Sequence, residues 1–143
     1  MDEQIRQILK RLANMQLQSD QPDYDVVAIS DTVEELMKLL ASDDVGEPVA
    51  QAVVDSVFSR EQASAILDIA TWSGGDNGAQ LQGTLNRWVR EANSEIKVWL
   101  AVNHHVFPFP TKGEMVKELE RVQLLFPQMR ERCEYLMHAR RDM

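Results

Sequence analysis

Apolar residues recur at every third or fourth position along most of this chain of 143 residues. This spacing is typical of amphipathic α-helices that bury one face, whereas the alternation of polar and apolar residues that marks strands is absent. No internal repeat and no low-complexity linker divides the chain. The pattern therefore predicts an all-α fold: a bundle of five to seven helices in a single domain that covers residues 1–143.

The clearest apolar stripe runs along the C-terminal part of the chain. Its members are Met115, Leu119, Val122, Phe126, Met129, Cys133 and Leu136. Pro127 interrupts this stripe, and a proline inside a helix removes a backbone hydrogen bond and disfavours helical geometry in the preceding residue. We predict a helical stretch over residues 112–140 that is kinked or broken between Phe126 and Pro127. Pro127 would then lie in the first turn of a last helix that ends near Arg140.

A second stripe predicts one long helix over residues 77–102. Its members are Leu81, Leu85, Trp88, Ala92, Ile96 and Trp99. We expect this helix to pack against the C-terminal stretch, with Gly83 marking a close helix crossing. Residues 103–110 include two prolines, each of which disfavours α geometry just before it, so we predict a loop there.

The N-terminal half begins with two predicted helices that form a hairpin. The first covers residues 2–18 on the spacing of its apolar residues. The second starts after Asp20, which can cap it, with Pro22 in its first turn. An alternative for the second segment is a short strand at residues 26–29, a β-branched run, followed by a helix capped by Asp31.

Further helix starts are marked by proline and by capping boxes. Glu47 and Pro48 open a third predicted helix. Ser59 and Gln62 have the spacing of a capping box that opens a fourth, which should end at the glycines near residues 72–75. A box of the same kind, Thr111 with Glu114, opens the C-terminal stretch.

The net charge is −8, and the acidic residues concentrate in residues 19–68, where 12 acidic residues face two basic ones. Such a surface repels the phosphates of nucleic acid, so we expect a protein partner with a basic surface instead. No apolar run approaches the roughly 20 residues that cross a bilayer, and the acidic N-terminus has no apolar signal region. With Cys133 as the single cysteine, these features predict a cytoplasmic protein that does not enter membranes.

Three features invite comparison with catalytic or ligand sites, and none completes the required pattern. The glycine-rich segment at residues 72–78 lacks the Lys-Ser/Thr pair of a phosphate-binding loop. His104 and His105 are adjacent, so on extended chain their side chains point apart, and no metal-binding motif accompanies them. Cys133 lies on the apolar stripe, which favours burial over reactivity. We therefore predict no catalytic residue, no cofactor and no metal site.

Several glutamates in the C-terminal half lie one helical turn from a basic residue, so ion pairing explains them without a catalytic role. Glu91 lies four residues from a base, Arg87, and Glu118 lies three residues from Arg121. Glu114 lies three residues from Lys117. These spacings are typical of ion pairs on the surface of a helix.

The segment Phe107-Pro108-Phe109-Pro110 is the most unusual local feature. Two aromatic residues on a stiff tether can clasp the ends of two helices, or they can anchor a partner protein. We expect the clasp, because a loop that joins two long antiparallel helices must cross their ends.

These observations favour a non-enzymatic protein–protein interaction protein: a subunit, adaptor or assembly factor of a larger complex. An alternative is a small acidic inhibitor, of the immunity, antitoxin or anti-defence type, that occupies a basic site on a target protein. A metal-dependent hydrolase is a third hypothesis, and self-association is left open. The candidate partner contacts are Asp43, Asp44, Glu47, Phe107, Phe109, Arg130, Arg140 and Arg141.

Overall fold

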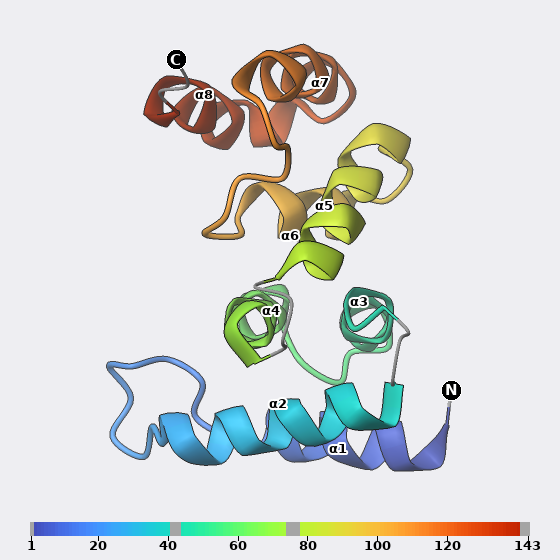
Figure 1. Ribbon diagram of the computed structural model, residues 1–143, viewed down its shortest axis with the longest axis vertical. Coiled ribbons are helices and arrows are strands. Elements are labelled where there is room, and N and C mark those ends of the chain that lie inside the picture. Colours follow the sequence, from blue (N-terminus) through green and yellow to red (C-terminus); the bar gives the residue numbers. More distant parts are fainter. Residues whose placement is uncertain (1, 41–43, 74–77, 141–143) are drawn as a thin grey trace. The chain divides into compact units, whose positions relative to one another are not determined.

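The computed structural model describes residues 2–40, 44–73 and 78–140, and every regular element within these ranges is helical (Figure 1). The all-α prediction is confirmed. The described residues form eight α-helices and one 3₁₀ turn, more than the predicted five to seven helices, because the predicted long helix over residues 77–102 is divided in two. By packing, the chain divides into two compact units, Met1–Leu81 (unit 1) and Gln82–Met143 (unit 2). A single domain stays a prediction.

Unit 1 contains the helices α1 (Glu3–Ala13), α2 (Val26–Leu40), α3 (Gly46–Val54) and α4 (Arg60–Ser73). α1 packs against α2, as the predicted hairpin requires, and α4 packs against both α2 and α3. The fully buried side chains come from the predicted apolar stripes. They include Leu9, Leu12, Ile29, Val33, Leu36, Val49, Ala63, Ile66 and Leu67.

The first two helices differ from prediction at their ends. α1 ends at Ala13, with Asn14 as its C-cap, well before residue 18. Residues 26–29 are helical, so the strand alternative is wrong. The cap of α2 is Asp25, whose Oδ1 accepts a hydrogen bond from the Ala28 amide at 3.1 Å, and Asp20 lies before the helix. Because α2 starts at Val26, Pro22 lies in the preceding turn.

The capping box at the start of α4 is confirmed. The Gln62 amide donates to Ser59 Oγ at 3.1 Å, and Gln62 Oε1 accepts from the Ser59 amide at 2.9 Å. α4 ends at Ser73 as predicted, and residues 74–77 of the glycine-rich segment lie outside the described residues. Gly78 is held at φ +79°, and a Cβ added there would lie 2.6 Å from Thr71 Cγ2. This position therefore requires glycine.

Unit 2 contains most of α5 (Ala79–Glu91), then α6 (Glu95–Val102), α7 (Lys112–Leu125), the 3₁₀ turn η1 (Pro127–Met129) and α8 (Arg130–Ala139). The predicted long helix over residues 77–102 is wrong, because the chain breaks between α5 and α6. α6 packs against α8, and α7 also packs against α8. Gly83 does not mark a close crossing: it is exposed, and an added Cβ would meet nothing within 4 Å.

Three features accompany the break between α5 and α6, two of them local in the chain and one from α7. Ala92 adopts a left-handed conformation with φ +48°, and its amide donates to the Trp88 carbonyl, which is a common way for a helix to end. Arg121 from α7 donates to the carbonyls of Val89 and Arg90, in the last turn of α5. Ser94 then caps α6 by accepting a hydrogen bond from the Lys97 amide.

The C-terminal stretch is two helices packed against each other. α7 ends at Leu125, Phe126 has non-helical backbone angles, and Pro127 opens η1, so the predicted break occurs at the predicted place. The chain reverses there, however, and α7 and α8 lie side by side (Figure 1). Residues of the stripe on both sides of the break are therefore buried, including Leu119 and Cys133.

Candidate interaction surfaces

The loop between α6 and α7 is fixed to unit 2 from two sides. Gln82 Nε2 of α5 donates to the Phe107 carbonyl at 3.1 Å, and the Arg90 guanidinium lies 5.1 Å from the centre of the Phe109 ring. At the end of α8, Arg140 donates to the carbonyls of Phe109 and Pro110 and lies over the Phe107 ring at 5.0 Å. The loop thus closes over unit 2 as a clasp.

These contacts decide which of the predicted aromatic and basic contacts lie at the surface. Phe109 is 0% exposed and Arg140 is 8% exposed, so both side chains face the interior. Phe107 is half-buried beneath Arg140. Arg130 is exposed and pairs with Glu134 at 2.9 Å, and Arg141 lies outside the described residues. A partner can reach Arg130 directly, but it can reach Phe109 only if the clasp opens.

The predicted acidic contacts lie at the start of α3. Asp44 is half-buried, and its Oδ1 accepts a hydrogen bond from the Gly46 amide at 2.8 Å. Glu47 is half-buried in the first turn of α3. Asp43 lies outside the described residues. The hydrogen bond of Asp44 gives that carboxylate a structural role at the start of the helix.

A more exposed acidic surface lies on α2, and sequence reasoning did not single it out. Val27, Asp31 and Glu34 follow each other at helical spacing and are all exposed, with Val27 at 65%. Val26, next to Val27, is 48% exposed. Among the described residues, no basic group pairs with Asp31 or Glu34. We call Val27, Asp31 and Glu34 the outer face of α2.

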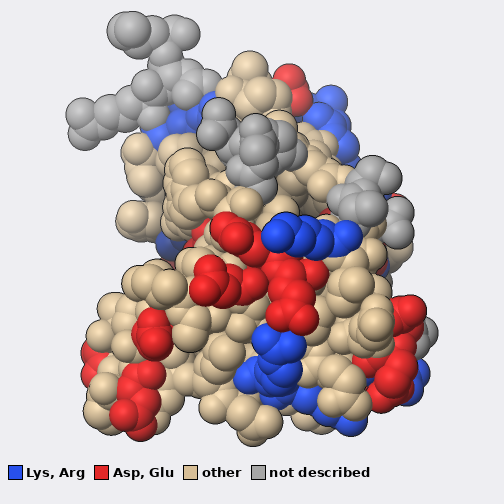
Figure 2. Space-filling view, turned by 60° about the horizontal axis from the view of Figure 1, so that its bottom comes forward, with Lys and Arg blue, Asp and Glu red and all other residues tan. Residues whose placement is uncertain are grey.

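Charge differs strongly between the two units. Unit 1 holds 15 acidic and five basic residues, for a net charge of −10, whereas unit 2 holds eight acidic and ten basic residues, for a net charge of +2. Figure 2 shows acidic side chains in several groups over the face it presents, with basic side chains among them. The excess negative charge of the protein therefore belongs to unit 1.

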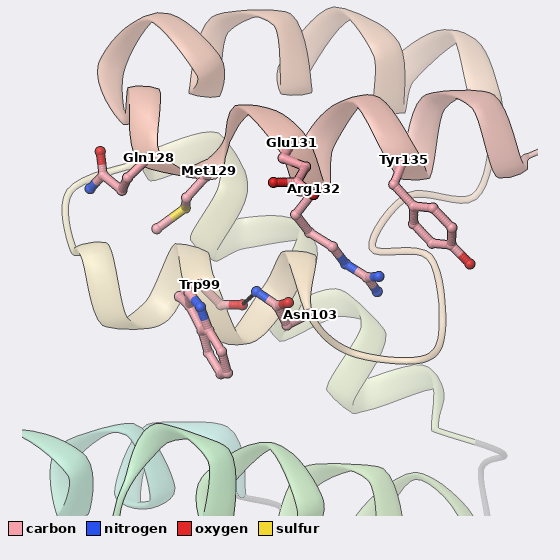
Figure 3. Close-up of a pocket in the computed structure, with 7 residues that line it drawn as sticks. All are labelled: Trp99, Asn103, Gln128, Met129, Glu131, Arg132 and Tyr135. Atoms are coloured by element: carbon pink, nitrogen blue, oxygen red, sulfur yellow. Dashed lines mark hydrogen bonds between the residues drawn. The ribbon is translucent and has the colours of Figure 1, made fainter.

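Unit 2 carries a groove of about 340 Å³ where α6 meets η1 and α8 (Figure 3). The stripes predicted that these two segments pack together, but sequence reasoning missed the groove, because apolar spacing does not show which partly exposed side chains line such a contact. It is lined by Trp99, Asn103, Gln128, Met129, Glu131, Arg132 and Tyr135. The one local signal was the pair Arg132 and Tyr135, which lie three residues apart and off the buried stripe of α8.

Cys133 and the two adjacent histidines are the residues whose chemistry could serve catalysis. Cys133 is 0% exposed, and burial raises the pKa of its thiol to about 11, so the nucleophilic thiolate is scarce at neutral pH. The rings of His104 and His105 lie 4.6 Å apart; His104 is buried and His105 is exposed.

Several helical carboxylates in unit 2 form ion pairs. Two predicted pairs are confirmed, Arg87 with Glu91 at 3.7 Å and Arg121 with Glu118 at 3.1 Å. Glu114 pairs with Arg90 of α5 at 3.0 Å, and not with Lys117 as predicted. The first two pairs lie within one helix, and the pair of Glu114 with Arg90 joins α7 to α5.

No family model matches the chain, and neither a curated protein nor a solved structure shows significant similarity to it. In the described part of the chain, no helix combines the length and apolar character needed to cross a bilayer.

Proposed function

We propose that this chain is a non-enzymatic interaction protein that binds a basic surface on another protein through the outer face of α2. The observation that carries the proposal is the exposure of Val27 beside two carboxylates, Asp31 and Glu34, that form no ion pair with any described residue. The apolar Val27 side chain can be buried against a partner at little cost, because it binds water weakly. The two carboxylates beside it, which form no ion pair, favour a partner of positive charge.

The charge of unit 1 supports the same conclusion. A net charge of −10 on 81 residues creates a field that accelerates the approach of a basic partner and repels acidic ones, nucleic acid included. Asp31 and Glu34 belong to a helix that is packed on α1 and α4. A helix that is packed in the fold has an ordered backbone before it binds, which lowers the entropy cost of binding.

The charge of unit 1 also favours a second candidate within the same class of interaction. A small acidic inhibitor would place these carboxylates where a target protein binds phosphates. It would bind one defined target in a fixed ratio, and its association rate would fall steeply as salt is added. An adaptor in a larger complex would instead be recovered with several proteins.

A photo-crosslinking amino acid introduced at Val27 tests the proposed surface in cells. Val27 is 65% exposed on α2, and Val54 at the end of α3 is 59% exposed and serves as the matched control. We expect illumination to give one discrete adduct from position 27 and none from position 54. Mass spectrometry of the adduct identifies the partner, which should carry a basic surface at the linked site.

Two results would contradict the proposal. One is an equal set of adducts from positions 27 and 54, which would mean that contacts at α2 are nonspecific. The other is a discrete adduct whose partner surface is acidic.

A further inference from the structure

We infer that the groove between α6 and α8 in unit 2 is a second binding surface, and that it takes a peptide segment of a partner protein in which an acidic residue lies next to an apolar one. This surface belongs to other helices than the outer face of α2. It favours an acidic partner, whereas the outer face of α2 favours a basic one. The protein would then connect two partners of different chemistry.

The acidic half of this specificity comes from Arg132. Its Nε donates to the Val102 carbonyl at the C-terminal end of α6, at 2.6 Å, and its guanidinium lies 4.9 Å from the centre of the Tyr135 ring. These two contacts fix the plane of the guanidinium. They use one of its five N–H donors, and a fixed guanidinium edge is suited to bind a carboxylate with two parallel hydrogen bonds.

The charge of Arg132 is not neutralised within the described residues. Its neighbour Arg130 pairs with Glu134 at 2.9 Å, whereas no described carboxylate lies within ion-pair distance of Arg132. Arg132 is half-buried, so part of its hydration shell is already lost. A carboxylate that enters the groove therefore meets a charge that has been oriented and partly desolvated in advance.

The apolar half of the specificity comes from Trp99, Met129 and Tyr135, whereas the other lining residues, Asn103, Gln128 and Glu131, are polar. Figure 3 shows Met129 toward one end of the groove and Arg132 with Tyr135 toward the other, and Trp99 also lines it. Trp, Tyr and Arg are the residues that most often dominate binding energy at protein interfaces, and Met adapts to different apolar shapes. Asn103 is held by a hydrogen bond from its Nδ2 to the Trp99 carbonyl at 3.0 Å.

The size of the groove limits how much of a partner it can hold. Its volume of about 340 Å³ lies at the lower end of the range for small-molecule sites, roughly 300–1,000 Å³. It holds one or two side chains. An Asp or Glu at Arg132 and an aromatic or aliphatic neighbour toward Met129 would fill it, with the remaining peptide outside. The net charge of +2 on unit 2 is compatible with such an acidic segment.

The test is a titration of the full chain with a defined peptide, followed by NMR. The probe has eight residues, with Asp-Phe at its centre and Gly-Ser flanks. The chain has three tryptophans, so three indole N–H signals report separately: Trp99 lines the groove, Trp72 is 67% exposed in unit 1, and Trp88 is 1% exposed. We expect a saturable shift of the Trp99 signal below about 1 mM peptide, with the other two signals unchanged.

Matched peptides and protein variants test whether binding depends on the charge pair between the peptide carboxylate and Arg132. The Asn-Phe peptide, which lacks only the charge, should bind at least about tenfold more weakly to the unmodified protein. Arg132→Gln should weaken binding of the Asp-Phe peptide by a similar factor. Arg130→Gln, the same change two residues away, should leave binding unchanged within about twofold. The pair Asp31→Asn with Glu34→Gln on α2 should also have no effect, so failure here is distinct from failure of the proposed function.

Three outcomes would overturn the inference. The first is the absence of any Trp99 shift with the Asp-Phe peptide. The second is equal binding of the Asp-Phe and Asn-Phe peptides to the unmodified protein, a result that does not depend on the folding of any variant. The third is binding of phenylacetate as tightly as the peptide, which would assign the groove to a small carboxylate.

Discussion

At the residue scale, side-chain hydrogen bonds explain most of the local structure, and the sequence revealed those that are local in the chain. Ser59 with Gln62 and the cap at Thr111 are separated by three residues, so their spacing was enough to predict them. Contacts across the fold could not be predicted in this way. Arg140 illustrates the limit, because its acceptors at Phe109 and Pro110 lie some thirty positions away, and the sequence showed it only as one of several C-terminal arginines.

Arg140 also carries a prediction about stability. Arg140→Gln should lower the free energy of unfolding by about 2–3 kcal/mol, because two carbonyls of the clasp lose a charged donor and the Phe107 ring loses its cation. Urea unfolding followed by circular dichroism measures this. Arg130→Gln is the control: its ion pair with Glu134 is exposed, so the loss should stay below about 0.5 kcal/mol. Equal losses in the two variants would show that the clasp adds nothing.

At the scale of helices, apolar spacing predicted which residues are buried better than it predicted where helices end. The stripe around Met115 and Cys133 is buried as expected, yet it belongs to two helices that face each other. The same spacing runs through Ala92, where the helix stops without glycine or proline. At this end, Arg121 reaches carbonyls in the last turn of α5 from α7. Ser94, with Glu95 after it, was the local sign of a new helix.

Two glycines near the start of α5 should respond oppositely to the same substitution. Gly83→Ala should raise the free energy of unfolding by up to about 1 kcal/mol, because the position is helical and exposed and the added methyl group meets nothing. Gly78→Ala should lower it by about 1–3 kcal/mol, because φ is +79° and the methyl group would overlap Thr71. Thermal unfolding of both variants beside the unmodified protein measures the difference. The same sign for both would contradict this account of α5.

At the scale of the whole molecule, the distribution of charge was visible in the sequence, but the surfaces that use it were not. The excess of acidic residues in residues 19–68 corresponds to the acidic unit 1. Asp44 and Glu47, which the sequence analysis predicted as partner contacts, are half-buried at the start of α3. Asp31 and Glu34 instead lie on an exposed face of α2. Burial of individual carboxylates depends on how α2 and α3 pack, which periodicity does not give.

The central claim is that the outer face of α2 binds a basic partner, and the association rate with the partner linked at Val27 tests it most directly. Asp31→Asn with Glu34→Gln should slow association several-fold at about 50 mM salt, with a much smaller change at about 500 mM, because screening removes the attraction. The control pair Glu95→Gln with Glu120→Gln makes the same change of charge at exposed positions of unit 2 and should leave the rate unchanged. Equal association rates for the α2 variant, the control variant and the unmodified protein would contradict the claim.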